Sequence, residues 1–384
     1  MKRFIYATIA LAAIAIGCTK SNIVDVPEGT ETPISFDIYN GKTPVTKAIE
    51  VTKDALMDCN NSSNPAFHVR ALNSASELYM NHDVWYAITT EDDPDTDANE
   101  EEGYWDYSGT MYWPINSPLT FFAYSPLSEQ VLTFTSNSHA TYTAAEYASD
   151  QKDLIVSEVV KNATAADGTV DLEFHHVLSR IGFQLETVGT GTNVVIHNII
   201  LHGTFANQGT INFLGDATTD PAITAGSSTT DSYTFFKSGQ IFSTKNATAT
   251  PVDGEDNVNR YTITASEGDN YMMIIPGQVK NLPDTDDTDE DQDLEELIIS
   301  PYIEVQYHLG DCVTNESNDD IITAKLPLLK DGQNWNFAAR TAYEFIFRVS
   351  ISAIEFEGEV VGWDDTTYFP EQEEEEEEEG PVTE

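Results

Sequence analysis

The acidic segment DTDDTDEDQDLE offers oxygen ligands at a spacing that could bind a calcium ion. Asp284, Asp286, Thr288 and Glu295 fall at positions one, three, five and twelve of such a loop. Asp289, however, takes the sixth position, where the sharp turn needs glycine, and the flanking sequence does not predict a pair of helices. We therefore interpret the segment as a solvated acidic loop rather than a metal site.

Histidine is the other potential metal ligand in this chain. His175 and His176 are adjacent, so in a strand they point to opposite faces and cannot share one metal. His197 and His202 lie in VVIHNIILHG, with no cysteine or acidic residue close to them in the sequence. We predict that all four are structural or surface residues and that the protein uses no metal or other cofactor.

Motifs for catalysis are absent from the sequence. It contains no G-x-S-x-G elbow, no glycine-rich phosphate loop and no H-E-x-x-H motif. With 65 aspartate and glutamate residues, a pair of carboxylates chosen for acid–base chemistry would carry no information. The sequence therefore predicts a protein that is not an enzyme and has no catalytic residues.

The net charge of −47 restricts the partners of the chain. Phosphate groups would be repelled, which argues against binding to nucleic acid or to an anionic membrane surface. Much of the charge lies in EDDPDTDANEEEG, DTDDTDEDQDLEE and the terminal EQEEEEEEEGPVTE, which are typical of solvated loops and a solvated tail.

Cys18 is the residue for which the sequence indicates a covalent modification. Lys2 and Arg3 precede an apolar run over residues 4–17, which has the length of a signal-peptide core and is too short to span a bilayer. The segment AIGC that ends the run resembles a bacterial lipobox, with alanine where leucine is more common. This resemblance implies cleavage between Gly17 and Cys18 and acylation (palmitate) of the cysteine, whereas an ordinary signal peptide would make the cysteine incidental. Two or three acyl chains, at about 0.8 kcal/mol per buried methylene, would hold the protein firmly in the membrane.

Cys59 and Cys312 are the other cysteines of the mature chain, and both lie in polar surroundings far apart in the sequence. Export permits a disulfide, but a bridge across two domains would be unusual. We favour thiols over a bridge at these positions.

The body of the chain predicts an all-β fold of two β-sandwiches in tandem. Short segments such as ISFDIYN, FHVRA, LTFFAYSP and YEFIFRVSIS alternate apolar and polar residues, and turn-forming residues separate them. Strands at intervals of about 8 to 12 residues favour sandwiches over an α/β sheet. The predicted divisions are a signal peptide (1–17), a lipidated tether (18–32), an N-terminal domain (33–176), a C-terminal domain (177–366) and an acidic tail (367–384).

An aromatic cluster surrounds EGYWDYSGTMYWP. If exposed, such rings could form a platform that stacks against sugars, but we favour packing in a sandwich core. The residues concerned are Trp85, Tyr104, Trp105, Tyr107, Tyr112 and Trp113.

Seven stretches, taken in order, resemble the fimbrillin family of anchored pilus lipoproteins, the type V pilins. They are CTKSN, PISFDIYNGKTPVTKA, FHVRA, YWPINSPLTFFAYSP, DLIVSEV, VDLEFHHVLSRIGFQLE and YEFIFRVSISAIEFEGEVVGWDD. The resemblance implies two transthyretin-like β-sandwich domains and assembly by strand exchange. In that scheme a trypsin-like protease removes the first strand of an exported lipoprotein, and a neighbouring subunit fills the groove.

The resemblance maps the removable strand onto ISFDIYN, with Ile34, Phe36 and Ile38 facing the groove. The cut would fall in GKTPVTKAIE, after Lys47 or else after Lys42. Family members often carry arginine at the processed position, where this chain has lysine.

The same resemblance places the donor strand in YEFIFRVSISAIEFEGEVVGW. Seven consecutive glutamates from Glu373 to Glu379 follow it, and they repel one another and cannot enter an apolar groove. An anchor or accessory subunit is therefore an alternative to a stalk subunit. The candidate donor residues are Phe345, Phe347, Val349, Ile351, Phe356 and Val360.

Together these features predict a structural subunit of an adhesive fimbria, located at the outer membrane and cell surface. Its partners would be other fimbrial subunits in head-to-tail contact and the membrane through its lipid, with no nucleic acid. The alternative is a monomeric surface lipoprotein that binds a glycan or host protein through its loops.

Overall fold

The computed structural model describes most of the chain between residues 32 and 361. The described ranges are 32–39, 56–90, 101–115, 117–127, 131–188, 193–215, 223–252, 254–255, 257–264, 271–282, 300–310, 321–330, 332–350 and 354–361. Within them the chain forms 27 strands, and its helical elements are two 3-10 turns at Ala148–Asp150 and Ala165–Asp167 and two α-helical residues, Leu56 and Met57. The predicted all-β fold is therefore confirmed. A search of these same ranges finds no helix with the length and apolar character of a transmembrane span.

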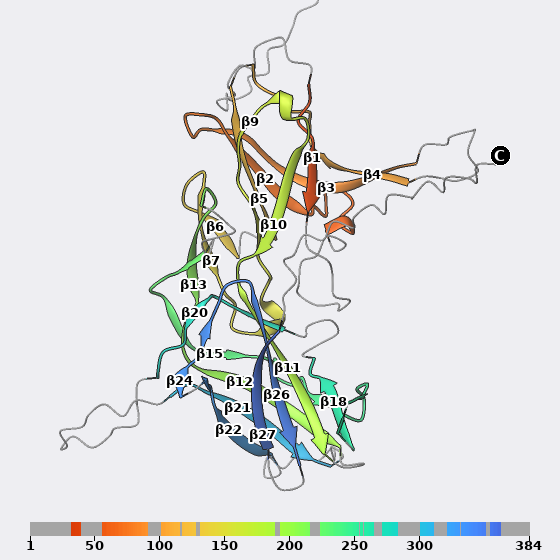
Figure 1. The fold of residues 1–384 in the computed structure, drawn as a ribbon, viewed down its shortest axis with the longest axis vertical. Coiled ribbons are helices and arrows are strands. Elements are labelled where there is room, and N and C mark those ends of the chain that lie inside the picture. The colour runs from red at the N-terminus through yellow and green to blue at the C-terminus, as the bar shows by residue number, and fades with distance from the viewer. Residues whose placement is uncertain are drawn as a thin grey trace, which may run out of the picture.

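The N-terminal half is built on one eight-stranded sheet, drawn in red to yellow-green at one end of the molecule in Figure 1. Its order is β1-β10-β8-β5-β2-β3-β4, with β9 paired to β5. Alternate apolar residues of these strands face a core of their own, which explains the alternation seen in the sequence. The strands are β1 (Phe36–Tyr39), β2 (Phe67–Leu72), β3 (Leu78–Thr90), β4 (Glu101–Tyr107), β5 (Leu119–Ser125), β8 (Ile155–Ser157), β9 (Val160–Ala163) and β10 (Val170–His176).

The C-terminal half contains a six-stranded sheet and a five-stranded sheet whose apolar faces share a second core. The first has the order β17-β18-β11-β26-β27, with β19 paired to β11; the second has the order β15-β12-β21-β22, with β16 paired to β12. The first contains β11 (Ser179–Val188), β17 (Thr250–Pro251), β18 (Val258–Thr262), β19 (Tyr271–Ile274), β26 (Thr341–Val349) and β27 (Ile354–Val361). The second contains β12 (Val194–Ala206), β15 (Thr229–Thr234), β16 (Phe242–Ser243), β21 (Tyr302–Leu309) and β22 (Ile322–Pro327).

Two further strand pairs complete this half. They are β20 (Gly277–Gln278) with β25 (Asn336–Phe337), and β23 (Leu329–Lys330) with β24 (Gln333–Asn334).

A four-stranded sheet connects the two halves, in the order β14-β13-β7-β6. β6 (Leu132–Phe134) and β7 (His139–Thr143) come from the N-terminal half, whereas β13 (Gln208–Asn212) and β14 (Ile223–Ala225) come from the C-terminal half. In Figure 1 β6, β7 and β13 lie between the two ends of the molecule. The chain does pass from one main sheet to the other between His176 and Ser179, near the predicted boundary, but this shared sheet crosses that boundary.

Candidate strand-exchange interface

β1 is the edge strand of the N-terminal sheet. It pairs in parallel with β10 over four residues, from Phe36 opposite Val170 to Tyr39 opposite Glu173. Figure 1 shows β1 lying beside β10 at this edge. Since one side of β1 carries the whole ladder, the strand can leave without breaking a second ladder in that sheet.

The residues just before β1 have a short second contact. Ile34 donates its backbone N–H to the carbonyl oxygen of Met111 at 2.9 Å, and Trp113 donates to the carbonyl oxygen of Thr32 at 3.1 Å. The hydroxyl of Tyr107 also donates to the Ile34 carbonyl oxygen at 2.7 Å. This short contact joins the residues before β1 to residues 111–113, which follow β4 at the opposite end of the strand order, and it leaves β1 itself at the edge.

The three residues predicted to face the groove are all buried. Ile34, Phe36 and Ile38 expose 2%, 5% and 0% of their surface, and the Phe36 ring meets the rings of Tyr107 and Phe121 edge-on at 5.8 and 6.1 Å. At about 1.5–3 kcal/mol for each side chain, their burial is worth roughly 5–9 kcal/mol as an upper value. Since a whole domain is stable by about 5–15 kcal/mol, a groove without this strand needs a replacement.

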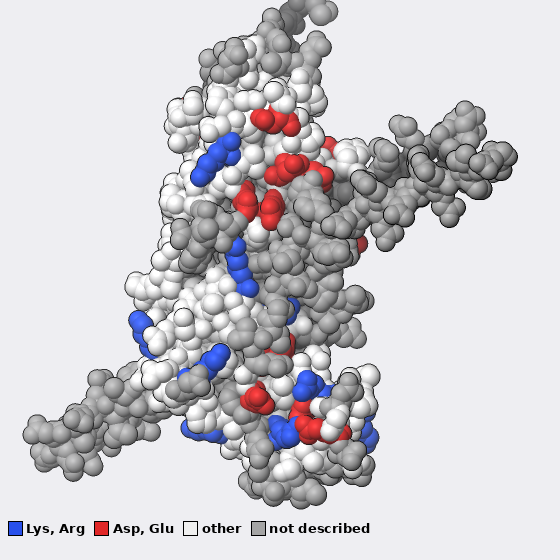
Figure 2. Space-filling model, in the orientation of Figure 1, with Lys and Arg blue, Asp and Glu red and all other residues white. Residues whose placement is uncertain are grey.

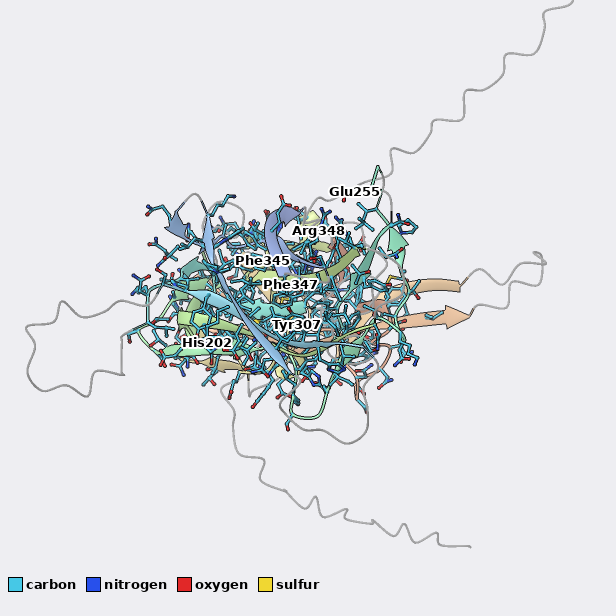
Figure 3. The ribbon with its side chains drawn as sticks, turned by 90° about the horizontal axis from the view of Figure 1, so that it is seen from below. His202, Glu255, Tyr307, Phe345, Phe347 and Arg348 are labelled. Atoms are coloured by element: carbon cyan, nitrogen blue, oxygen red, sulfur yellow. The ribbon has the colours of Figure 1, made fainter. Side chains whose placement is uncertain are left out.

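The candidate donor residues are divided between two strands that differ in their pairing. Phe345, Phe347 and Val349 belong to β26, which pairs in parallel with β11 and antiparallel with β27. In Figure 3 Phe345 and Phe347 lie in the interior of the C-terminal half, and both are fully buried. Releasing β26 would break two ladders at once.

β27 is instead an edge strand. Among the described strands its eight residues pair with β26 alone, with Phe356 opposite Phe347 and Val360 opposite Tyr343. Gly358 lies so close to the core that an added Cβ would come within 2.6 Å of the Phe345 ring and 3.0 Å of the Trp335 ring.

An ionic cluster ties the centre of the C-terminal sheet together. Glu186 of β11 accepts hydrogen bonds from Arg260 of β18 at 2.6 Å and from Arg348 of β26 at 2.8 Å. Arg348 also donates to Glu255 at 2.7 Å, and Figure 3 shows these two residues away from the buried phenylalanines. Burial alone would raise the pKa of Glu186, but the two guanidinium groups hold it below its usual value.

Several predicted sites lie outside the described residues. They are Gly17 and Cys18 of the signal, the processing candidates Lys42 and Lys47, Ile351 of the donor segment, Cys312 and the acidic loop at 284–295. Cys59 lies within the described residues and is half-buried, and burial together with Asp58 raises the pKa of its thiol.

Half of the aromatic cluster belongs to the core, and Trp85 is only partly buried. Trp105, Tyr107 and Trp113 expose 6%, 8% and 0% of their surface, which confirms core packing for these residues. Tyr104 and Tyr112 are exposed by 47% and 40%. The two tryptophans are therefore closed to a sugar that stacks on the surface.

The histidines have partners that the sequence did not reveal. His202 was expected to lack an acidic neighbour, but its Nε2 lies 3.5 Å from a carboxylate oxygen of Glu304 on the adjacent strand β21. Burial lowers the pKa of His202. The Nε2 of His197 lies 2.7 Å from the Nδ1 of His308. Strands that are about a hundred residues apart in the chain supply both partners, so local sequence could not indicate them.

His175 and His176 follow the prediction that they point to opposite faces. The Nδ1 of His176 lies 2.8 Å from a carboxylate oxygen of the fully buried Asp153. The Nε2 of His175 instead lies near Glu158 and Glu173, at 3.3 and 3.6 Å. The two histidines therefore have separate partners.

These observations define a class of all-β proteins. Such a protein has a buried edge strand at one end and a long edge strand at the other. The sequence profile of the fimbrillin-like family matches residues 61–363, well over half of the chain. The protein belongs to this family. The matched range begins after β1 and includes β27.

Solved structures of similar proteins come from Bacteroides and Parabacteroides species. A fimbrial protein from Bacteroides vulgatus is 18% identical, with a TM-score of 0.44 over 86% of this chain and 99% of the other. A proposed cell adhesion protein from Bacteroides uniformis is 15% identical, with a TM-score of 0.44 over 88% and 100%. A proposed cell adhesion protein from Bacteroides ovatus is 12% identical, with a TM-score of 0.45 over 88% and 99%. No curated protein sequence matches the chain significantly.

Proposed function

We propose that this protein is a structural subunit of a cell-surface fimbria that supports adhesion. The subunit reaches the outer membrane as a lipoprotein anchored through Cys18. A protease then removes β1, and a strand from a neighbouring subunit takes its place. The observation that carries this proposal is the edge position of β1 together with the complete burial of its alternate side chains.

The energetic argument starts from the groove that β1 would leave. An acceptor without β1 would expose the unpaired edge of β10 beside the apolar surface that now covers Phe36. An incoming strand would satisfy the backbone groups through main-chain hydrogen bonds, while its alternate apolar side chains would set the register. Because donor and acceptor are different surfaces, the contact does not close on itself and a filament grows.

We favour β27 over β26 as the donor. β27 gives up a single ladder when it leaves, whereas β26 would give up two and the contacts of Arg348 with Glu186. A donated β27 would carry the residues after it out of its own subunit, so the glutamate run beyond it could stay in water.

Trypsin cleavage of the recombinant chain that begins after Cys18 tests the proposal. We expect a cut after Lys47 that releases β1, followed by multimers that size-exclusion chromatography and electron microscopy detect. The triple variant Lys42→Gln/Lys47→Gln/Lys53→Gln should prevent both events, while Lys42→Gln alone should leave them unchanged. A synthetic peptide with the sequence of residues 33–39 should slow assembly by refilling the groove.

A chain cut after Lys47 that stays strictly monomeric would contradict the proposal. That outcome would favour the alternative of a solitary surface lipoprotein that binds a glycan or host protein. Truncation before Ile354 separates donor from acceptor: the truncated chain should fail to polymerise by itself and should still accept one full-length subunit.

A further inference from the structure

Three ligand-type side chains meet on the outer side of β10, close to the end of β1. Glu173 and His175 are two residues apart on this strand, so their side chains point to the same face. Glu158 follows β8 and donates its backbone N–H to the Glu173 carbonyl oxygen at 2.7 Å. Glu173 is also the residue opposite Tyr39, the last residue of β1. The cluster thus belongs to the strand on which β1 is paired.

The distances between the ligand atoms of this cluster are closer to those between two ligands of one metal ion than to the length of a charge-assisted hydrogen bond. The His175 Nε2 lies 3.3 Å from a Glu158 oxygen and 3.6 Å from a Glu173 oxygen. Charge-assisted N–H···O bonds are about 2.7–2.9 Å long. By contrast, bonds of about 2.0–2.2 Å to a tetrahedral Zn²⁺ place two ligand atoms roughly 3.3–3.6 Å apart. All three ligand atoms lie within 4.8 Å of one another, so rotation of a half-exposed carboxylate would complete the set.

The neighbouring histidine differs in its acidic partners. The Nδ1 of His176 lies 2.8 Å from one carboxylate oxygen, that of the buried Asp153. His175 lies on the same strand and has two carboxylates near its Nε2, at distances that suit a shared metal ion.

Charge and exposure also favour a cation at this position. Carboxylates on facing strand positions repel one another, and a divalent ion would remove that repulsion. The His175 side chain is 7% exposed, whereas those of Glu158 and Glu173 are 37% and 36% exposed, so the open side is accessible to the ion and to a water ligand. Figure 2 shows acidic side chains gathered over β1 and β10.

We propose that Glu158, Glu173 and His175 form a binding site for a divalent transition-metal ion of the Zn²⁺ type. The imidazole nitrogen favours Zn²⁺ over Ca²⁺ and Mg²⁺, which prefer oxygen ligands alone. Three protein ligands leave the fourth position of the metal to water. This site joins β8 to β10, and its existence does not depend on strand exchange.

Titration of the full chain with Zn²⁺ in the presence of excess Ca²⁺ tests the proposal. The Ca²⁺ occupies the acidic loops and the glutamate run, which offer only oxygen. We expect one Zn²⁺ per chain to bind under these conditions and to raise the thermal midpoint of unfolding. Co²⁺ in the same site should give the visible absorption of a tetrahedral complex, and His175→Gln should abolish this absorption.

Glu158→Gln and Glu173→Gln keep the proposal testable if His175→Gln does not fold. Each should weaken Zn²⁺ binding at least tenfold and remove most of the thermal shift. Asp171→Asn is the matched control, because it removes an exposed carboxylate from the same strand outside the cluster. Equal Zn²⁺ affinity of the two glutamine variants and the control would overturn the proposal, as would a failure of Zn²⁺ to bind in excess Ca²⁺.

Discussion

β1 and β27 are both edge strands, but the two halves of the molecule hold them differently. β1 forms a parallel ladder of four residues, and together with Ile34 just before it, it buries three large apolar side chains. β27 forms an antiparallel ladder of eight residues, and at Gly358 its backbone lies directly on aromatic rings. The backbone ladder of β27 is therefore twice as long as that of β1, whose attachment depends strongly on side-chain burial.

This difference has a direct consequence for strand exchange. A strand held by side-chain burial leaves a deep apolar slot when it is removed, and only a strand with apolar residues at alternate positions can fill that slot. A strand held by its ladder leaves a shallow edge and a stable sheet behind it. The first arrangement suits an acceptor and the second suits a donor.

The largest expected effect is at Phe36, whose aromatic ring is the largest of the three buried side chains. Phe36→Ala should lower the free energy of unfolding of the N-terminal half by about 3–5 kcal/mol, because it opens a cavity beside Tyr107 and Phe121. Ser35→Ala is the control on the exposed face and should cost about 0.5 kcal/mol or less. Urea unfolding followed by tryptophan fluorescence measures both changes. If both substitutions lowered the free energy of unfolding equally, the conclusion that side-chain burial holds β1 in place would be wrong.

The next effect tests how closely β27 approaches the core. Gly358→Val should lower the free energy of unfolding by about 1–3 kcal/mol, since the new Cβ would meet the Phe345 ring at 2.6 Å. Glu357→Val, on the exposed face of the same strand, should be neutral or slightly stabilising because valine suits a strand. Hydrogen exchange should show faster opening of β27 in the first variant alone. Unchanged protection there would mean that contact with the core contributes little to β27.

The smallest effect concerns the ionic cluster that holds β26 in place. Glu186→Gln should lower the free energy of unfolding by about 1–2 kcal/mol near neutral pH. The two arginines are partly exposed, so each loses only part of the stabilisation that a charged hydrogen bond provides. β26 should then exchange its amide hydrogens faster, which hydrogen exchange detects. Glu255→Gln is the control, since it removes a half-exposed carboxylate that contacts Arg348 and not Glu186's other partner, Arg260, among the described residues.

The pH dependence of this variant follows from the pKa of Glu186. Its folded-state pKa lies below the ordinary value of 4.5, so the folded state binds the proton less tightly than the unfolded state does. The contribution of Glu186 is therefore complete above about pH 4.5 and is lost as the pH falls through the folded-state pKa. Wild type and Glu186→Gln should differ in urea unfolding at about pH 7 and converge as the pH falls below the folded-state pKa. A constant difference would mean that the carboxylate charge is unimportant.

Local sequence was sufficient to predict the fold class and the residues that face the cores. The alternation in FHVRA places Phe67, Val69 and Ala71 on one face, and all three are fully buried. The same rule gave Ile34, Phe36 and Ile38 as buried positions of a strand. These properties depend on the period of the strand, which adjacent residues alone determine.

The order of the strands was decided only in the tertiary structure. Nothing near Phe345 indicates that β26 lies between β11 and β27, or that β6 and β7 pair with strands beyond His176. The contacts of His202 with Glu304, and of His175 with Glu158, likewise join residues from different strands. Sequence determines which side of a strand is apolar, but a strand's neighbours depend on long-range pairing between segments, and a single sequence does not record that pairing locally.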